Sequence, residues 1–270
     1  MGAFTIRMQD SAQEFFADGT SRTISREWVP EVPVALEFNG LAYAVMMATP
    51  ADLEDFVRGF ALTEGLAGDV GEIQAIAIAE TDKGIVARAQ LAGLGVEQLT
   101  ERVRTRVAES SCGLCGIENL EAVGQPLPLV PEHDQASSEA IFRAVGDLRE
   151  KQALGRATGA AHCAGFADLS GTILEVREDV GRHNAIDKLI GALAASGRDI
   201  AQGIVISTAR CSYEIVEKVV KAGGTRLVTV SLPTSMAVER ARVAGLSLAC
   251  LARDDSYLGI GSANRLIDPA

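Results

Sequence analysis

The first third of the chain alternates between apolar and polar positions in short runs, a period-two pattern that predicts β-strands. Residues 33–38 alternate, Asn39 and Gly40 supply the turn of a hairpin, and residues 41–48 return as its second strand. Residues 1–31 are polar and show no such period. They are therefore interpreted as a tail or an edge segment.

A helix is predicted directly after this hairpin. Thr49 is interpreted as the helix cap, Pro50 as part of the first turn, and Asp52 as the acidic residue that a helix start favours. Gly65 is expected to end the helix. The apolar residues at helical spacing, which are predicted to face the core, are Leu53, Phe56, Val57 and Phe60.

A second hairpin follows, because residues 73–79 and 85–91 are two alternating runs around a turn at residues 82–84. Two hairpins and one helix predict a small α+β domain over residues 1–123. Residues 124–136 hold three prolines and few helix formers, so they are interpreted as a linker.

The second half of the chain alternates between short apolar strands and helices, which predicts a layered α/β domain over residues 137–270 with a partly parallel sheet. The expected strands are 161–167, 172–176, 203–207, 227–231 and 246–251, and the expected helices are 137–150, 184–195, 213–222 and 235–244. Ligands of such sheets collect beyond the carboxyl ends of the strands. Three loops are predicted to lie there, at residues 178–183, 208–213 and 232–235.

Composition narrows the class of protein. The chain has 270 residues, 47% of them hydrophobic, and a formal net charge of −11. Nonspecific nucleic-acid binding is not expected, because phosphate neutralisation needs a basic surface. A membrane span is not expected either, since the longest apolar runs are short. Five cysteines, an odd number, without a signal peptide predict free thiols in the cytoplasm.

Two of the cysteines carry the clearest chemistry. Cys112 and Cys115 stand three residues apart between small residues, a setting that leaves a thiolate accessible to a partner. A structural zinc site needs two more ligands at suitable spacing, and none is evident, so no metal is predicted. A thioredoxin-like dithiol and a persulfide carrier both fit the spacing, and the motif alone does not separate them.

The carboxyl-end loops supply candidate anion ligands. Arg182 and His183 stand at a strand-to-helix turn, and Arg210 occupies a similar turn further along. Helix starts offer unpaired N–H groups, and an arginine adds bidentate phosphate contacts. A capped helix with a solvated arginine is the simpler alternative. The zinc deaminase signature, His-x-Glu followed by Pro-Cys-x-x-Cys, is absent.

Taken together, these segments resemble the FdhD family of formate dehydrogenase accessory sulfurtransferases. The resemblance extends from about residue 32 to residue 265 and includes several long motifs in order. These motifs are residues 33–40, 46–56, 110–116, 178–185 with 187–188, 212–214 and 233–235.

The resemblance implies a cytidine-deaminase-like second domain without zinc ligands, a homodimer and a sulfurtransferase activity. Such proteins take persulfide sulfur from a cysteine desulfurase on the first motif cysteine, here Cys112, with Cys115 assisting. They pass it to the bis-molybdopterin guanine dinucleotide (Mo-bis-MGD) cofactor, which then serves formate dehydrogenase, and GDP is expected to mimic that cofactor. The implied cofactor contacts are Leu251, Ala252, Arg253, Asp254, Asp255 and Ser256, joined by Arg182, His183, Arg210 and His162.

The sequence departs from the family pattern at some of these positions. Of the two arginines usual in the stretch at residues 251–256, only the first is kept, as Arg253. Cys211 also stands where the family usually has alanine. The alternatives left by the sequence are a dithiol oxidoreductase and a non-catalytic chaperone that binds the molybdenum cofactor.

Overall fold

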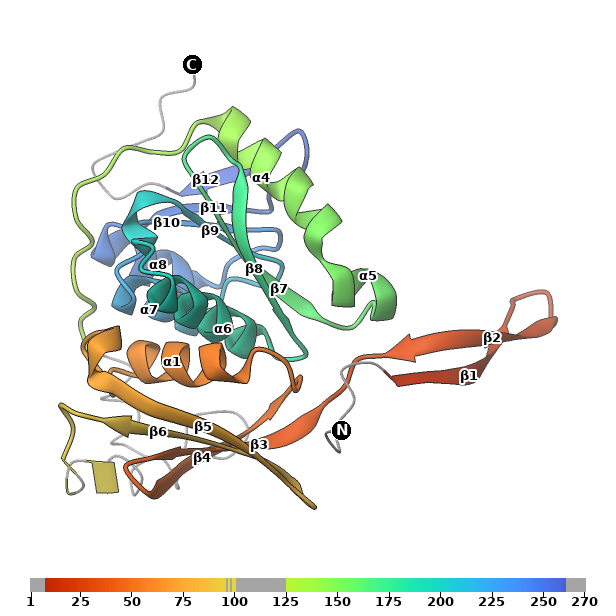
Figure 1. The fold of residues 1–270 in the computed structure, drawn as a ribbon. Helices are drawn as coiled ribbons and strands as arrows, with labels where there is room; N and C mark the ends of the chain where they lie inside the picture. The colour runs from red at the N-terminus through yellow and green to blue at the C-terminus, as the bar shows by residue number, and fades with distance from the viewer. Residues whose placement is uncertain (1–7, 96, 98, 101–124, 261–270) are drawn as a thin grey trace.

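The computed structural model describes residues 8–95, 97, 99–100 and 125–260. Its strands form sheets of two, four and six members (Figure 1). Helices α1 and α6 lie between the two larger sheets (Figure 1). The predicted α/β class is therefore confirmed.

The four-stranded sheet has the order β4-β3-β6-β5. It contains β3 (Val32–Phe38), β4 (Leu41–Ala48), β5 (Ile73–Thr81) and β6 (Gly84–Leu91). Both predicted hairpins are confirmed, and they join because β3 pairs with β6 in parallel. Asn39 and Gly40 adopt positive φ angles of 50° and 78°, as the hairpin turn requires.

Helix α1 (Leu53–Thr63) packs on this sheet, and its predicted apolar residues are buried. The predicted cap is wrong. The helix begins after Asp52, which has a φ of 52° and makes no side-chain cap bond. Thr49 is fully buried and its hydroxyl accepts instead from Val180 N, 3.1 Å away, in the other half of the chain. Thr49 thus makes a tertiary contact with Val180 instead of capping the helix. The predicted end is confirmed, since Gly65 follows the helix at a φ of 65°.

The six-stranded sheet has the order β12-β11-β10-β9-β7-β8. Its strands are β7 (His162–Ala167), β8 (Ile173–Asp179), β9 (Ile204–Ser207), β10 (Arg226–Thr229), β11 (Ser247–Cys250) and β12 (Leu258–Ile260). Strands β9, β10 and β11 are parallel, and β7 is antiparallel to both of its neighbours. The carboxyl ends of β8, β9, β10 and β11 consequently share one edge with the amino end of β7.

Helices cover both faces of this sheet (Figure 1). One face carries α6 (Arg182–Ala195), α7 (Tyr213–Lys221) and α8 (Ser235–Ala244), and the other carries α4 (Ser138–Lys151), followed by α5 (Ala153–Thr158). In β9, Val205 packs in the core under α6, α7 and α8, whereas Ile204 and Ile206 pack in the core under α4. A central strand buried on both faces reads as a continuous apolar run, which explains the pattern found in the sequence. Two short 3₁₀ turns, η1 (Val70–Glu72) and η2 (Ile200–Gln202), complete the elements.

The two halves meet where α1 crosses α6. A Cβ atom added to Gly59 would lie 1.7 Å from Asp187 O, and one added to Gly191 would lie 1.9 Å from Asp55 O. The helix backbones therefore touch directly, and only glycine fits at these two positions. The boundary at residues 124–136 stays a prediction.

The amino-terminal segment differs from its prediction as a tail or an edge. Strands β1 (Met8–Phe15) and β2 (Ser21–Trp28) form a regular antiparallel hairpin that projects from the molecule (Figure 1). Most of its residues are exposed. Because neither face is buried in a core, the sequence carries no apolar alternation that would have revealed the strands.

Candidate functional site

The three predicted loops lie at the edge formed by the carboxyl ends of β8, β9 and β10. We call residues 178–183, 208–213 and 232–235, together with His162, the carboxyl edge. Backbone bonds join neighbouring parts of it: Thr208 N donates to Cys163 O at 3.0 Å, and Cys211 N donates to Leu232 O at 3.3 Å. The topology thus places the polar turns singled out in the sequence side by side.

The loop after β8 is held from within by a buried carboxylate. Asp179 is fully buried and lies 2.6 Å from the ammonium group of the equally buried Lys188. Its second oxygen, Oδ1, accepts from Gly181 N at 2.7 Å and from the Asn184 amide at 2.9 Å. Thr49 N donates to Asp179 Oδ2 at 3.0 Å, and Lys188 donates to Thr49 O at 2.9 Å. These groups are fully engaged with one another, so they position the loop.

This network also explains the glycine at position 181, just before helix α6. A Cβ atom there would lie 2.7 Å from the Asn184 amide nitrogen and 3.3 Å from Asp179 Oδ1. The glycine therefore makes room for the internal hydrogen bonds of the loop.

Arg182 and His183 begin α6 and face the start of α7. His183 Nε2 lies 3.0 Å from Glu214 Oε2. The contact with His183, and the charges of Arg182 and Lys218, hold the pKa of Glu214 below its ordinary value. Arg182 is half-buried, and no carboxylate within the described ranges forms an ion pair with it. Its positive charge is thus not neutralised by direct contact with these residues.

His162 stands at the amino end of β7, on the same edge. Burial lowers the pKa of His162, and the positive charges of Arg182 and His183 lower it further, while Asp179 opposes them. A neutral imidazole is therefore favoured here at neutral pH. Its ring nitrogens can then donate one hydrogen bond and accept another.

The remaining predicted arginines differ from each other. Arg210 is exposed on the loop after β9, and in the described part of the chain it has no acidic partner. The Arg253 guanidinium donates to Ala252 O at 2.9 Å and also to Val230 O. Arg253 is thus tied to backbone carbonyls, whereas the guanidinium groups of Arg210 and Arg182 have no hydrogen-bond acceptor among the described residues.

The stretch at residues 251–256 forms the connection from β11 to β12. Leu251 is half-buried with a φ of 51°, and Ala252 is fully buried. Asp254 forms an ion pair with Arg149 at 2.7 Å. Ser256 O accepts from Arg253 N, and the Ser256 hydroxyl donates to exposed Asp255 at 3.0 Å. This connection is a turn closed by its own hydrogen bonds, with two carboxylates on its surface.

The predicted persulfide pair, Cys112 and Cys115, lies outside the described residues. The three cysteines that are described, Cys163, Cys211 and Cys250, are free thiols and are buried. Burial, with a smaller contribution from Glu178, raises the pKa of Cys163 far above its ordinary value. Because all three thiols are buried, none of them is accessible to act as a nucleophile.

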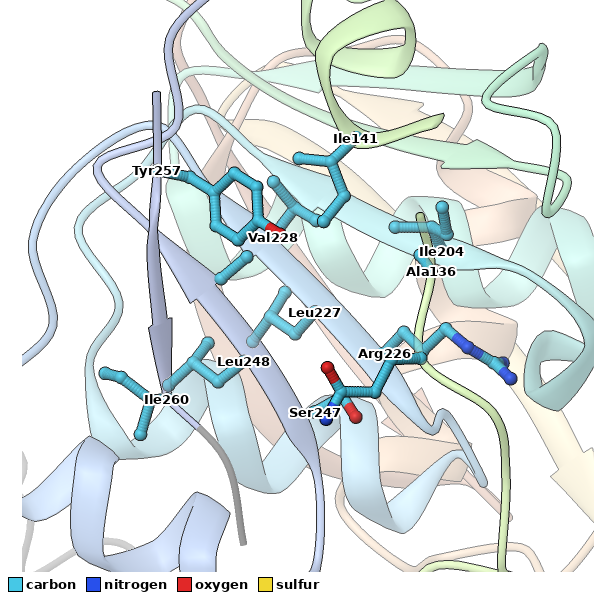
Figure 2. Close-up of a pocket in the computed structure, with 12 residues that line it drawn as sticks. Ala136, Ile141, Ile204, Arg226, Leu227, Val228, Ser247, Leu248, Tyr257 and Ile260 are labelled. Atoms are coloured by element: carbon cyan, nitrogen blue, oxygen red, sulfur yellow. The ribbon is translucent and has the colours of Figure 1, made fainter. Parts of the chain in front are cut away.

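Two hollows lie away from the carboxyl edge. Figure 2 shows one near the amino ends of β10 and β11, lined in part by Tyr257 and Ile260, with a volume of about 30 Å³. It holds little more than a water molecule, and Arg226 beside it already donates to Asp134 O and Ala201 O. A groove of about 500 Å³ lies where α1 and α6 end. It is lined by apolar residues such as Leu62 and Leu193, together with Arg198 and Lys221.

Sequence reasoning missed a second buried ion pair behind the carboxyl edge. Asp187 accepts from Lys218 at 3.0 Å and from the Thr63 hydroxyl at 2.7 Å. Lys218 also donates to Glu64 at 3.1 Å. Burial raises the pKa of Asp187, which Lys218 counteracts. These residues join α1, α6 and α7, and their wide separation in the sequence gave no local signal.

The described residues hold neither a metal-binding cluster nor a membrane-spanning helix. No group of three or more His, Cys, Asp or Glu side chains there is arranged to hold a metal ion. Within the same ranges, no helix has the length and apolar character needed to cross a membrane.

The fold and the carboxyl edge define a layered α/β protein in which Arg182 and Arg210, which have no ion-pair partner in the described ranges, lie at strand ends. Residues 29–266 match the FdhD/NarQ family, and the chain belongs to this family. Its curated relatives include "Sulfur carrier protein FdhD" of Variovorax paradoxus (strain S110), 45% identical over 235 residues that cover 87% of this chain and 84% of the relative.

A second relative of the same name is that of Xanthomonas campestris pv. campestris (strain B100). It is 40% identical over 248 residues, which cover 92% of this chain and 88% of the relative. A crystal structure from Desulfotalea psychrophila, described as that of a proposed formate dehydrogenase accessory protein, superposes with a TM-score of 0.75. It covers 97% of this chain and 100% of its own at 20% identity, which supports the fold.

Proposed function

We propose that this protein carries sulfane sulfur on Cys112 from a cysteine desulfurase to the Mo-bis-MGD cofactor of formate dehydrogenase. The observation that carries the proposal is the Cys-x-x-Cys pair in a family whose curated relatives, 40% to 45% identical, are named sulfur carriers. The cofactor is treated as cargo. A homodimer in the cytoplasm is part of the same proposal.

The charges of the carboxyl edge support an anionic cargo. The chain has a net charge of −11, yet Arg182 and Arg210 have no ion-pair partner within the described ranges. Several surface arginines of this chain are paired with acids; Arg88, for example, pairs with Glu37 at 2.5 Å. Guanidinium groups left with free donors suit a pyrophosphate, which they bind with charge-assisted hydrogen bonds.

The residues of the carboxyl edge are assigned to different parts of the cargo. Arg182, Arg210 and the amino ends of α6 and α7 are assigned to the phosphates of the cargo. The turn at residues 251–256 exposes Asp254 and Asp255, whose charges would repel phosphate. We therefore assign this turn to the nucleoside part, through backbone groups. His162 and His183 would then supply neutral or cationic hydrogen-bond donors beside the phosphates.

The sulfur chemistry balances in two steps. The Cys112 thiolate attacks the outer sulfur of the desulfurase persulfide, which forms Cys112–S–SH and releases the desulfurase thiolate. Attack of the Cys115 thiolate on the inner sulfur then releases hydrosulfide to the cargo and leaves a Cys112–Cys115 disulfide. A cellular dithiol must reduce that disulfide before the next cycle. Cys115 would thus determine turnover but not the first loading.

The test combines sulfur loading with nucleotide binding. After incubation with a desulfurase and cysteine, the intact mass should rise by about 32 Da, the mass of one sulfur atom, and the Cys112→Ala variant should show no increase. GDP should bind the unloaded protein. A dithiol oxidoreductase would show neither result, and a non-catalytic cofactor chaperone would show only GDP binding. Loading of Cys112→Ala would exclude Cys112 as the carrier.

The nucleotide contacts have their own test. Arg182→Met and Arg210→Met should each raise the GDP dissociation constant by about tenfold or more, because each removes a charged hydrogen bond of about 1.5–3 kcal/mol. Arg88→Met is the matched control, since Arg88 is already paired with Glu37 on the four-stranded sheet. Equal effects in all three variants would mean that the carboxyl edge does not bind the phosphates.

A further inference from the structure

Cys211 and Cys250 lie side by side behind the carboxyl edge. Cys211, in the loop after β9, forms an isolated parallel bridge with Pro233, which stands in the loop after β10. Cys250 is the last residue of β11, the strand next to β10. Both side chains belong to the core under α6, α7 and α8, and a hydrogen bond joins them. The fold thus brings together two thiols that are far apart in the sequence.

This hydrogen bond makes the two thiols unequal. Cys211 donates its S–H to the Cys250 sulfur, and this bond, together with burial, raises the pKa of Cys211 far above its ordinary value. The same bond lowers the pKa of Cys250 and outweighs the opposing effect of burial. Cys250 is therefore the thiol that ionises first, and Cys211 touches it as a resolving thiol. Redox-active cysteine pairs have this arrangement.

Cys211 lies in a surface loop. Arg210, the residue before it, is exposed. Two backbone hydrogen bonds hold Cys211 to the neighbouring loop: its N–H donates to Leu232 O at 3.3 Å, and Thr234 N donates to its carbonyl at 2.9 Å. Local opening of a loop needs less free energy than global unfolding. A small oxidant would therefore reach the pair while this loop is open, although both thiols are buried when it is closed.

We infer that Cys211 and Cys250 are a second redox-active dithiol of this chain, which a hydroperoxide oxidises to a disulfide. The inference goes beyond the proposed sulfur transfer, because neither Cys112 nor Cys115 takes part in it. The sulfur atoms of a disulfide are about 2.05 Å apart, closer than two thiols that are joined only by a hydrogen bond. Closing the disulfide therefore draws the loop after β9 and the end of β11 together.

The oxidation balances in two steps. The Cys250 thiolate attacks one oxygen of the hydroperoxide, the O–O bond breaks, and a Cys250 sulfenic acid forms as water or an alcohol leaves. The Cys211 sulfur then attacks the sulfenic sulfur, the S–O bond breaks, and the disulfide forms as water leaves. The two thiols together lose two protons and two electrons, which the hydroperoxide takes up. A dithiol reductant reverses the reaction.

Peptide mapping after oxidation tests the disulfide. The full-length chain would carry Cys112→Ser and Cys115→Ser, so that the proposed sulfur carrier cannot react. After hydrogen peroxide under native conditions and alkylation of the remaining thiols in urea, trypsin should release peptides 211–218 and 243–253 joined by a disulfide that dithiothreitol cleaves. Cys163 is the matched control, because it is a buried thiol in the opposite core, under α4. It should remain unlinked and alkylated.

Cys211→Ala in the same background separates a specific pair from general oxidation. It introduces the alanine expected from the family pattern, so we expect the variant to fold. Its Cys250 should be recovered without a disulfide at the same peroxide concentration. The inference would be overturned by the absence of the linked peptide, by its formation only in unfolded protein, or by linkage of Cys163 as fast as that of Cys211 to Cys250.

GDP binding is a second readout, which rests on the proposed function. Arg210 directly precedes Cys211, and the turn at residues 251–256 directly follows Cys250. Oxidation should therefore raise the GDP dissociation constant about threefold or more, because displacing Arg210 weakens a charged hydrogen bond. Dithiothreitol should restore the affinity, and peroxide should not change it in Cys211→Ala. Equal affinity of the linked and reduced protein would overturn the effect on the carboxyl edge, whereas reduced protein that does not bind GDP would contradict only the proposed function.

Discussion

Replacing Lys188 by methionine should destabilise the protein strongly, because Lys188 is one half of a buried ion pair. Lys188 and Asp179 are both completely buried, with 2.6 Å between the ammonium nitrogen and the carboxylate oxygen. Methionine fills a similar volume but carries no charge. The substitution therefore leaves the Asp179 carboxylate buried without its cation.

The size of the effect follows from the partners that remain. Removing one member of a buried ion pair costs about 3–5 kcal/mol. After Lys188→Met, Asp179 keeps three N–H donors, those of Thr49, Gly181 and Asn184. We therefore expect the lower value, about 3 kcal/mol. After Asp179→Asn, the buried Lys188 ammonium group loses its counter-charge and keeps only neutral carbonyl acceptors, and the new amide NH2 group competes with N–H donors that bound the carboxylate, so the loss should be larger, near about 5 kcal/mol.

Urea unfolding measures both losses, from the shift in midpoint at constant slope. Arg156→Met is the control, because its ion pair with Glu150 is exposed and should contribute no more than about 1 kcal/mol. A loss below about 1 kcal/mol for Lys188→Met would show that the pair does not hold the loop. An Asp179→Asn variant more stable than Lys188→Met would contradict the count of remaining partners.

Two further predictions concern the helix crossing and the carboxyl edge. Gly59→Ala should destabilise the protein by about 1–3 kcal/mol or more, because its methyl group would meet the Asp187 carbonyl. Gly146→Ala is the control, because Gly146 on α4 has open space around it, and it should stabilise the protein by about 0.5–1 kcal/mol. Similar urea midpoints for the two variants would contradict the close contact of the α1 and α6 backbones. Glu214→Gln should be less stable than the wild type at pH 7. In urea titrations the difference should shrink as the pH falls below 4.5, the ordinary pKa of a glutamate, because folding lowers the pKa of Glu214. This sign follows because the unfolded chain binds that proton more tightly, and a pH-independent difference would contradict it.

The strands and helices that bury one regular face were predictable from the sequence. Alternation and the Asn39-Gly40 turn revealed β3 and β4, and helical spacing revealed α1. The β1–β2 hairpin escaped detection because it buries no face. The start of α1 was wrong because the hydroxyl of Thr49 is used by Val180, 131 residues away. Local rules do not anticipate such a contact.

The candidate site was predictable in its location but only partly in its roles. Strand–loop–helix order placed Arg182 and Arg210 at one edge, because parallel strands end together. The same reasoning could not separate ligands from supports. Asp179 and Lys188 have the residue types of a functional pair, yet their burial and mutual contacts give them a structural role. Such pairs form between distant positions, and only the tertiary fold brings them together.

An isotope chase tests the central claim, that Cys112 hands sulfur to a guanylated molybdenum cofactor, most directly. The protein would be loaded with ³⁴S from labelled cysteine and a desulfurase, freed of donor, and mixed with Mo-bis-MGD. We predict that the label disappears from the peptide containing Cys112 and appears in the cofactor, and that Arg182→Met slows this transfer while loading stays normal. Label that remains on the protein, or that reaches the cofactor equally well from Cys112→Ala, would contradict the account.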